Sequence, residues 1–139
     1  MTVTATPVFV QTPKITPQTF ANADGTTKKT IFTAGANGSK VVAILAGSTD
    51  TAARTAQLWL TRSAVSYLLG TVVVAIGAGS DGTARTANLM PSTLMDGLPL
   101  DNDGQRYLYL ESGDTLQVGF TVAVTAAKQI DINAIGADF

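Results

Sequence analysis

The side chains best suited to chemistry in this sequence form two aspartate–arginine pairs in similar settings. Asp50 precedes Arg54 in GSTDTAARTAQL, and Asp81 precedes Arg85 at the same spacing in GSDGTARTANL. A guanidinium group donates two parallel hydrogen bonds to a carboxylate or to carbonyl oxygens of another protein. We therefore take Arg54 and Arg85 as candidate partner-binding residues. The alternative is that two loops of one domain use a similar arginine-bearing connection.

Residues for catalysis are sparse. The chain has no His and no Cys, and its single glutamate is Glu111. Histidine is the commonest general base and transition-metal ligand, and a Ser or Thr nucleophile would here need a carboxylate or lysine as its base. The sequence contains no GxSxG or SxxK pattern. We predict that the protein is not an enzyme and has no cofactor and no small-molecule substrate.

One short segment, LDNDGQRY, could offer oxygen ligands to calcium through Asp101, Asn102 and Asp103. An EF-hand loop also needs alternating ligands and a bidentate glutamate at position 12, where the best register places Leu110. A hairpin turn is the favoured interpretation, and no metal site is predicted. The glycines of AIGAGSDG are not followed by the lysine or helix of a phosphate cradle, so they predict a loop.

The composition indicates one domain with an unusually uncharged surface. The chain has 139 residues, of which 45% are hydrophobic and 14% charged, whereas charged residues make up roughly 25% of an average domain. A surface of Thr, Ser, Ala, Asn and Gly suits coverage by partner subunits, so we expect a homo-oligomer. An ordinary Thr-rich β-protein surface is the alternative.

The charge distribution favours neither nucleic acid nor membrane as a partner. Nine basic and ten acidic side chains give a net charge of −1, and the basic ones are scattered, without the footprint that binds polyanions. No apolar window approaches a membrane span, and the first residues lack the basic start and apolar block of a signal peptide.

Three prolines, Pro7, Pro13 and Pro17, divide the first twenty residues into short extended pieces. This region, 1–20, is predicted to be an extended N-terminal arm that packs on its own domain or on a neighbour, with Phe9 as a candidate partner-binding residue. Residues 21–139 are predicted to form a single β-sandwich domain.

Short strand signals separated by Gly, Asn and Asp predict an all-β fold, an antiparallel β-sandwich. The clearest is LQVGFTVAV, in which alternate residues from Leu116 to Val124 are apolar and share one face. KVVAILAG is apolar on both faces, as expected of a central strand covered on two sides. Strands are predicted near Thr30–Thr33, Lys40–Ala46, Ala56–Thr61, Ser66–Ile76, Tyr107–Glu111, Thr115–Val124 and Gln129–Ile135.

Three aromatic residues are predicted to point away from the core. The alternation that buries Leu58 and Leu110 places Trp59, Tyr107 and Tyr109 on outer faces. Such residues form the centres of protein interfaces, so all three are candidate partner-binding residues. Packing against a neighbouring loop or the arm is the alternative for each.

The order of these segments resembles small β-sandwich proteins of tailed-phage virions. KKTIFTAGANGSKVVAILAGSTDTAARTAQLWLTR, YLLGTVVVAIGAG, LPLDNDGQRYLYLESGDTLQVGFTVAV and INAIGADF together are similar to capsid decoration, or cement, proteins of jelly-roll fold. The resemblance implies a jelly-roll type of sandwich. It also implies a structural protein on the outer surface of the phage head that binds and bridges the major capsid protein.

Two alternatives remain open. One is a tail, baseplate or fibre-associated β-domain of the same virion. The other is a carbohydrate-binding module in which Trp59, Tyr107 and Tyr109 form a sugar-stacking platform.

Overall fold

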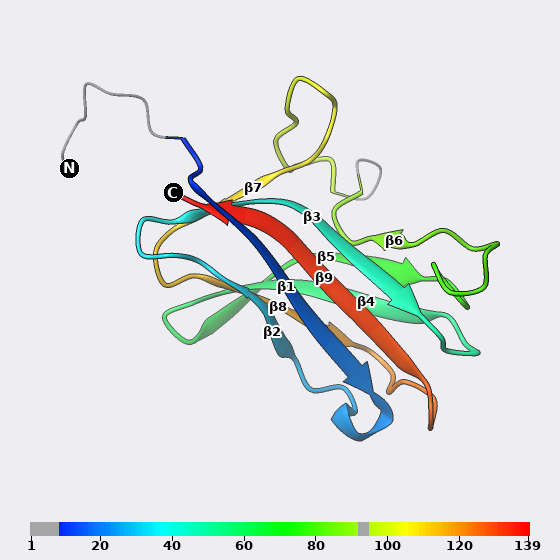
Figure 1. The fold of residues 1–139 in the computed structure, drawn as a ribbon. Coiled ribbons are helices and arrows are strands. Elements are labelled where there is room, and N and C mark those ends of the chain that lie inside the picture. Colours follow the sequence, from blue (N-terminus) through cyan, green and yellow to red (C-terminus); the bar gives the residue numbers. More distant parts are fainter. Residues whose placement is uncertain (1–8, 92–94) are drawn as a thin grey trace, which may run out of the picture.

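Two antiparallel sheets pack face to face in the computed structural model, which describes residues 9–91 and 95–139 (Figure 1). This confirms the predicted all-β antiparallel sandwich. A 3-10 turn, η1 (Asn22–Asp24), links the first two strands. Sheet A has the spatial order β1 (Thr12–Ala21), β9 (Gln129–Asp138), β3 (Ser39–Ser48) and β6 (Ala87–Asn88), with β7 (Leu108–Leu110) beside the other end of β3. Sheet B has the order β2 (Lys29–Thr33), β8 (Thr115–Phe120), β4 (Arg54–Arg62) and β5 (Val65–Val74).

Each of the seven predicted strands overlaps an observed one, with one clear difference in length. The strand predicted to reach Val124 ends at Phe120, and Val122, expected in the core, is exposed. After Phe120 the main-chain N–H of Thr121 donates to the carbonyl of Thr55, and the chain turns before Val124 returns to the interior. Alternating apolar residues therefore do not guarantee a continuing strand.

The N-terminal region is part of sheet A from Thr12 onward. β1 pairs with β9 along its whole length, from Thr12 opposite Asp138 to Ala21 opposite Gln129. Pro13 lies in this strand because β1 is at the sheet edge, where an N–H is not needed on the open side. The residues predicted to be an arm thus include an edge strand of the sandwich, and residues 1–8 lie outside the described part.

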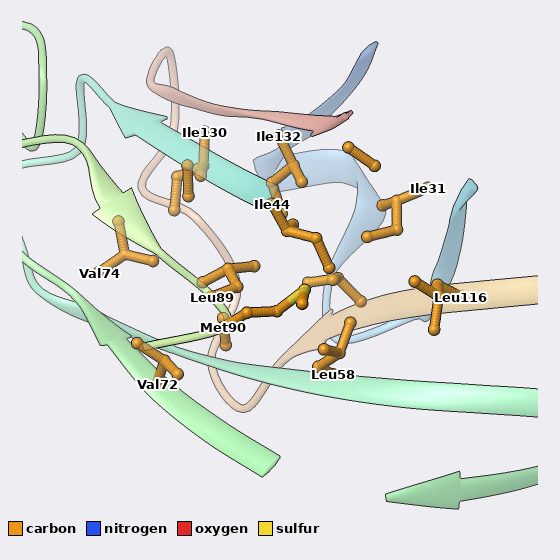
Figure 2. Close-up of a cluster of buried hydrophobic side chains, with 14 of the residues drawn as sticks. Ile31, Ile44, Leu58, Val72, Val74, Leu89, Met90, Leu116, Ile130 and Ile132 are labelled. Carbon is orange, nitrogen blue, oxygen red and sulfur yellow. The ribbon is translucent and has the colours of Figure 1, made fainter. Parts of the chain in front are cut away.

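The core lies between the sheets and is filled by alternate residues of both (Figure 2). Leu89 and Met90 enter it from the segment after β6. Each fully buried aliphatic side chain contributes about 1.5–3 kcal/mol, so this layer is the main source of stability. The labelled side chains of Figure 2 that belong to strands are Ile31, Ile44, Leu58, Val72, Val74, Leu116, Ile130 and Ile132.

A β-bulge in β3 bends sheet A. The register between β3 and β9 shifts at Val42, which has no partner in β9. Opposite this bulge, a Cβ on Gly136 would lie 2.3 Å from the carbonyl oxygen of Lys40. Only glycine therefore lets β9 approach β3 this closely, and the exposed Val42 side chain is turned outward.

Substitutions on the two faces of β1 test whether this strand belongs to the domain. Phe20→Ala removes a buried ring that contacts Phe120 edge to face at 5.1 Å, so we expect a loss of about 3–5 kcal/mol in urea unfolding. Ile15→Ala is the control on the same strand, because its side chain is 64% exposed. It should change stability by less than about 0.5 kcal/mol. Equal, small effects would contradict the pairing of β1 with β9.

Candidate partner-binding surface

The repeated aspartates make the same local turn. Asp50 Oδ1 accepts the main-chain N–H of Ala52 at 3.0 Å, and Asp81 Oδ1 accepts that of Thr83 at 2.8 Å. Each aspartate thus folds the two following residues into an Asx turn. The loops also touch each other, since the Ser48 N–H donates to the Ala78 carbonyl at 2.7 Å. The sequence pattern shared by the two loops therefore encodes the same turn in each.

Arg54 does not project from the body, which corrects its prediction as a partner-binding residue. Its Nε donates to Asp50 Oδ2 at 2.6 Å, and its Nη2 donates to Thr125 Oγ1 at 2.7 Å. The Arg54 side chain is only 12% exposed, and that of Asp50 is fully buried. Because Asp50 is buried, it must be paired, and Arg54 supplies that charge. The role of Arg54 is internal.

Arg85, by contrast, is exposed and forms no ion pair with any carboxylate of residues 9–91 and 95–139. Asp81 does not hold it, because both hydrogen bonds to Asp81 Oδ1 come from the main chain, at Thr83 and Ala84. Arg85 lies near β6, at the opposite end of β3 from β7. Of the two repeated arginines, Arg85 alone is placed to meet a partner.

Trp59 and the two tyrosines lie on opposite outer faces of the sandwich. Trp59 is half-buried on sheet B, where the ammonium group of Lys28 lies 4.3 Å from the ring centroid. Tyr109 lies on sheet A, opposite Lys40 of β3. Trp59, Tyr107 and Tyr109 therefore do not form the single sugar-stacking platform that a carbohydrate-binding module would need.

The tyrosines instead form an aromatic cluster with the last residue of the chain. The rings of Tyr107 and Tyr109 meet edge to face at 5.1 Å, and Phe139 lies 5.9 Å from Tyr109. Lys40 places its ammonium group 4.6 Å from the Tyr107 ring, a cation–π contact that holds the cluster in place. Tyr109 remains 58% exposed. The aromatic cluster thus presents ring surface to solvent.

Phe9 belongs to the same end of the molecule. The strand pairing of β1 extends one residue beyond Thr12, since the Gln11 N–H donates to the Asp138 carbonyl at 2.8 Å. Phe9, two residues before Gln11, therefore lies close to the end of sheet A that carries Phe139. Its side chain is 71% exposed. The start of β1, which Phe9 precedes, thus lies beside the end of β9 and near β7, the strand that carries Tyr109 (Figure 1).

The outer face of sheet A continues the aromatic cluster with an apolar surface, which ends along β9 at Asn133 and Asp131. Its central row aligns Ile15 of β1 with Ile135 of β9 and Ala43 of β3. No second layer among the described residues covers this face, contrary to the prediction that the strand KVVAILAG is covered on both sides. We call it the apolar face and define it by Pro13, Ile15, Pro17, Val42, Ala43, Leu45, Ile135 and Ala137.

The outer face of sheet B is different in chemistry. Its alternate residues are mainly Thr and Gln, as at Gln57, Thr61 and Gln117, and they bond to one another: Thr61 Oγ1 donates to Gln117 Oε1 at 2.9 Å. Trp59, its largest ring, is covered by Lys28. Apart from Trp59, the large apolar residues of this face are Leu68 and Val73, which are exposed on the edge strand β5.

Two members of the aromatic cluster were missed by sequence reasoning. Phe139 is the final residue, where no strand alternation can be read beyond it. Lys40 begins the apolar strand KVVAILAG, and its cation–π contact with Tyr107 depends on the position of a strand far away in the sequence. Its register opposite Tyr109 could not be read from the sequence.

Other polar groups in the described segments serve the fold. Arg62 donates to both carboxylate oxygens of Asp114 at 2.7 and 2.6 Å, beside a shallow depression of about 390 Å³, and Arg106 donates to the Leu98 carbonyl. Asp101 Oδ1 accepts main-chain N–H groups of Asp103 and Gln105, which confirms the hairpin turn there.

Among the described residues, no group of three or more His, Cys, Asp or Glu side chains is placed to hold a metal ion. None of their helical segments has the length and hydropathy of a membrane span. No protein-family model matches the chain, and neither a curated protein nor a solved structure matches it.

Removing Arg54 should destabilise the fold. Arg54→Ala leaves the buried carboxylate of Asp50 unpaired, and breaking such a pair costs about 3–5 kcal/mol. Arg85→Ala is the matched control at the second copy of the repeat, and it should cost no more than about 0.5 kcal/mol. Both values are measured by urea unfolding at pH 7. An unfolding free energy unchanged in Arg54→Ala would show that the ion pair does not form.

The same ion pair predicts a decline in stability with acid. Burial alone would raise the pKa of Asp50, but the hydrogen bonds from Arg54 and Thr125 outweigh it and hold the pKa well below its usual range. Stability from a lowered pKa is fully present above the unfolded-state value of about 3.9 and is lost as the pH falls through the folded-state value. We expect unfolding free energy to drop below about pH 4.

In Asp50→Asn this decline should be shallower, because the ionising group is gone. Asp114, whose pKa is lowered by its hydrogen bonds from Arg62, keeps part of the slope in that variant. The measurement is a series of urea unfolding curves from pH 7 to pH 2. Identical slopes for the wild type and Asp50→Asn would contradict the assignment.

Proposed function

We propose that this protein is a virion structural protein that binds the outside of a phage head and cements or decorates the lattice of the major capsid protein. Its apolar face and aromatic cluster, on sheet A, are the surface that meets the capsid. The observation that carries the proposal is the unequal chemistry of the two outer faces. Ile15, Val42 and Tyr109 are exposed on one side, whereas on the other side Thr and Gln dominate β4 and β8, and the exposed Leu68 and Val73 are confined to the edge strand β5.

An exposed apolar sheet face is costly for a solitary protein. Contiguous apolar patches on soluble monomers are rarely larger than a few hundred Å², and larger ones mark interaction sites. Within the apolar face, Pro13, Ile15 and Pro17 come from one strand and Val42 from another two strands away. Aromatic anchors such as Tyr109 and Phe9 suit the centre of a protein interface.

A decoration protein also needs only modest affinity at each contact. The symmetry of a shell repeats the same contact many times, so weak binding at each site is sufficient. Small residues such as Ala43 and Ala137 permit close approach of a neighbouring backbone. Arg85, exposed at the opposite end of β3, offers a bidentate donor to a second subunit.

The proposal includes a sandwich of jelly-roll type, as the resemblance implied. Jelly rolls place eight strands in two sheets joined by two Greek keys. The strand orders β1-β9-β3-β6 and β2-β8-β4-β5 support this type, because strands consecutive in the chain lie in opposite sheets from β1 through β4. The eighth strand position, beside β3, is shared by two short strands: β6 pairs with one end of β3 and β7 with the other.

Binding to capsids tests the proposed function. Purified protein is mixed with undecorated phage heads, and bound protein is measured after sedimentation of the heads. We expect saturable binding. Tyr109→Ala should weaken it at least about tenfold, as expected for an interface anchor worth more than 1.4 kcal/mol, and Ile15→Lys should weaken it similarly.

The matched control for Ile15→Lys is Gln57→Lys, which adds the same charge to the outer face of sheet B. It should bind heads as the wild type does. Absence of saturable binding to heads would refute the proposal. A gold-labelled antibody that marks tails and not heads in intact particles would also refute the proposal, and it would support a tail, baseplate or fibre location.

A further inference from the structure

The four sheet edges of the sandwich differ in how they are protected. An unprotected edge strand exposes a row of N–H and C=O groups that can pair with another chain, and natural edges are blunted by proline, lysine, bulges or short length. The edge strands are β1 and the β6–β7 pair in sheet A, and β2 and β5 in sheet B. Comparing them shows where another strand could add.

Three of these edges are closed. β1 contains Pro13 and Pro17, which lack an N–H, and Lys14. β2 has five residues, and its outer carbonyl groups already accept hydrogen bonds from β1 side chains; the Gln18 amide, for example, donates to the Thr30 carbonyl at 3.2 Å. On the remaining edge, β6 has two residues and β7 three. None of them offers a long free ladder.

β5 is the open edge. Its ten residues, VSYLLGTVVV, include no proline and no charged side chain, and they are rich in β-branched and aromatic residues. In the described part of the chain, β4 is the only strand that pairs with β5. Val65, Tyr67, Leu68 and Val73 are exposed along it. The one protective feature is a bulge at Leu69, which leaves 70–74 as a regular stretch.

The strand that best matches this edge is β5 of a second copy. None of the other described edge strands of this chain is both as long and free of proline and charge. An antiparallel pair of identical strands about a two-fold axis also places the side chains next to the axis near their own counterparts. Like charges in such pairs are destabilising, and β5 has none. Its sequence is therefore compatible with itself.

We propose that β5 is a self-association edge, through which two copies pair antiparallel about a two-fold axis near Val72. Thr71 of one copy then faces Val73 of the other on the outer face of sheet B. The two four-stranded sheets become one sheet of eight strands. With the axis at Val72, residues 70–74 of the two copies pair, and five residues a side are fewer than the roughly 20–30 of a standard interface, so we expect a weak dimer.

A lysine at the centre of the paired edge tests this inference in the isolated protein, without any capsid. Val73 is 58% exposed, so Val73→Lys is expected to leave the fold intact. Across the two-fold axis the two substituted positions are diagonal neighbours, about 7–8 Å apart in a paired ladder, so the two positive charges repel each other. In sedimentation velocity over a concentration series, we expect the wild type to form dimers and Val73→Lys to weaken dimerisation at least tenfold.

Val73→Thr is the matched control, because it keeps the β-branched shape and stays uncharged, and it should dimerise within about threefold of the wild type. Circular dichroism and thermal unfolding confirm that each variant is folded. Since the chain has no Cys, cysteine substitutions give a second readout: Thr71 of one copy faces Val73 of the other, so oxidation of a mixture of Thr71→Cys and Val73→Cys should form a covalent dimer, whereas a mixture of Thr71→Cys and Arg85→Cys should not.

A wild type that is monomeric at every concentration, or a dimer unaffected by Val73→Lys, would overturn the inference. A monomer whose β5 pairs instead with a strand of a different protein would also overturn it. Because these measurements use the isolated chain, their failure is independent of the outcome of head binding.

Discussion

The pairing of β9 with both β1 and β3 is the interaction on which the rest of the structure depends. The last strand of the chain lies between the first and third, so sheet A cannot form until the C-terminal residues are in place. At the end of this ladder, Asp138 accepts a hydrogen bond from Ser39 and forms an ion pair with Lys14 at 3.5 Å. These contacts join all three strands. They also bring Phe9 and Phe139 to the same end as the tyrosines.

Period-two alternation carried most of the fold prediction, and it failed where local chemistry overrode it. The core positions Leu58, Leu116 and Val118 followed directly from alternation. The strand β1 did not, because its prolines also fit an unpaired extended arm, and only pairing with residues more than a hundred positions away distinguishes the two. The turn between β4 and β5 uses Ser63 and Ala64, both with positive φ, a conformation for which these residue types give no signal.

The candidate site shows the same division between local and distant information. Each Asx turn of the repeat is determined by its aspartate and the next few residues. The position of the arginine side chain is not determined locally, because Arg54 donates hydrogen bonds to Thr125, 71 residues away, as well as to Asp50. Arg85 has an identical position relative to its aspartate and remains exposed. Alternation likewise predicted that Trp59 and Tyr109 point outward, but it did not predict on which sheet each residue lies.

The two proposed surfaces are geometrically consistent with each other. Antiparallel pairing of β5 requires a two-fold axis perpendicular to the combined sheet, and such an axis turns neither copy over. Both apolar faces would then point to the same side of the dimer, because sheet A lies on one side of sheet B in each copy. A dimer of this kind presents two equivalent docking faces to a lattice of repeating subunits. Linking two sites raises the effective concentration for the second contact. Coverage of both β5 and the apolar face would also account for the low surface charge. The uncharged strands that would promote aggregation in a monomer would then be enclosed within the assembly.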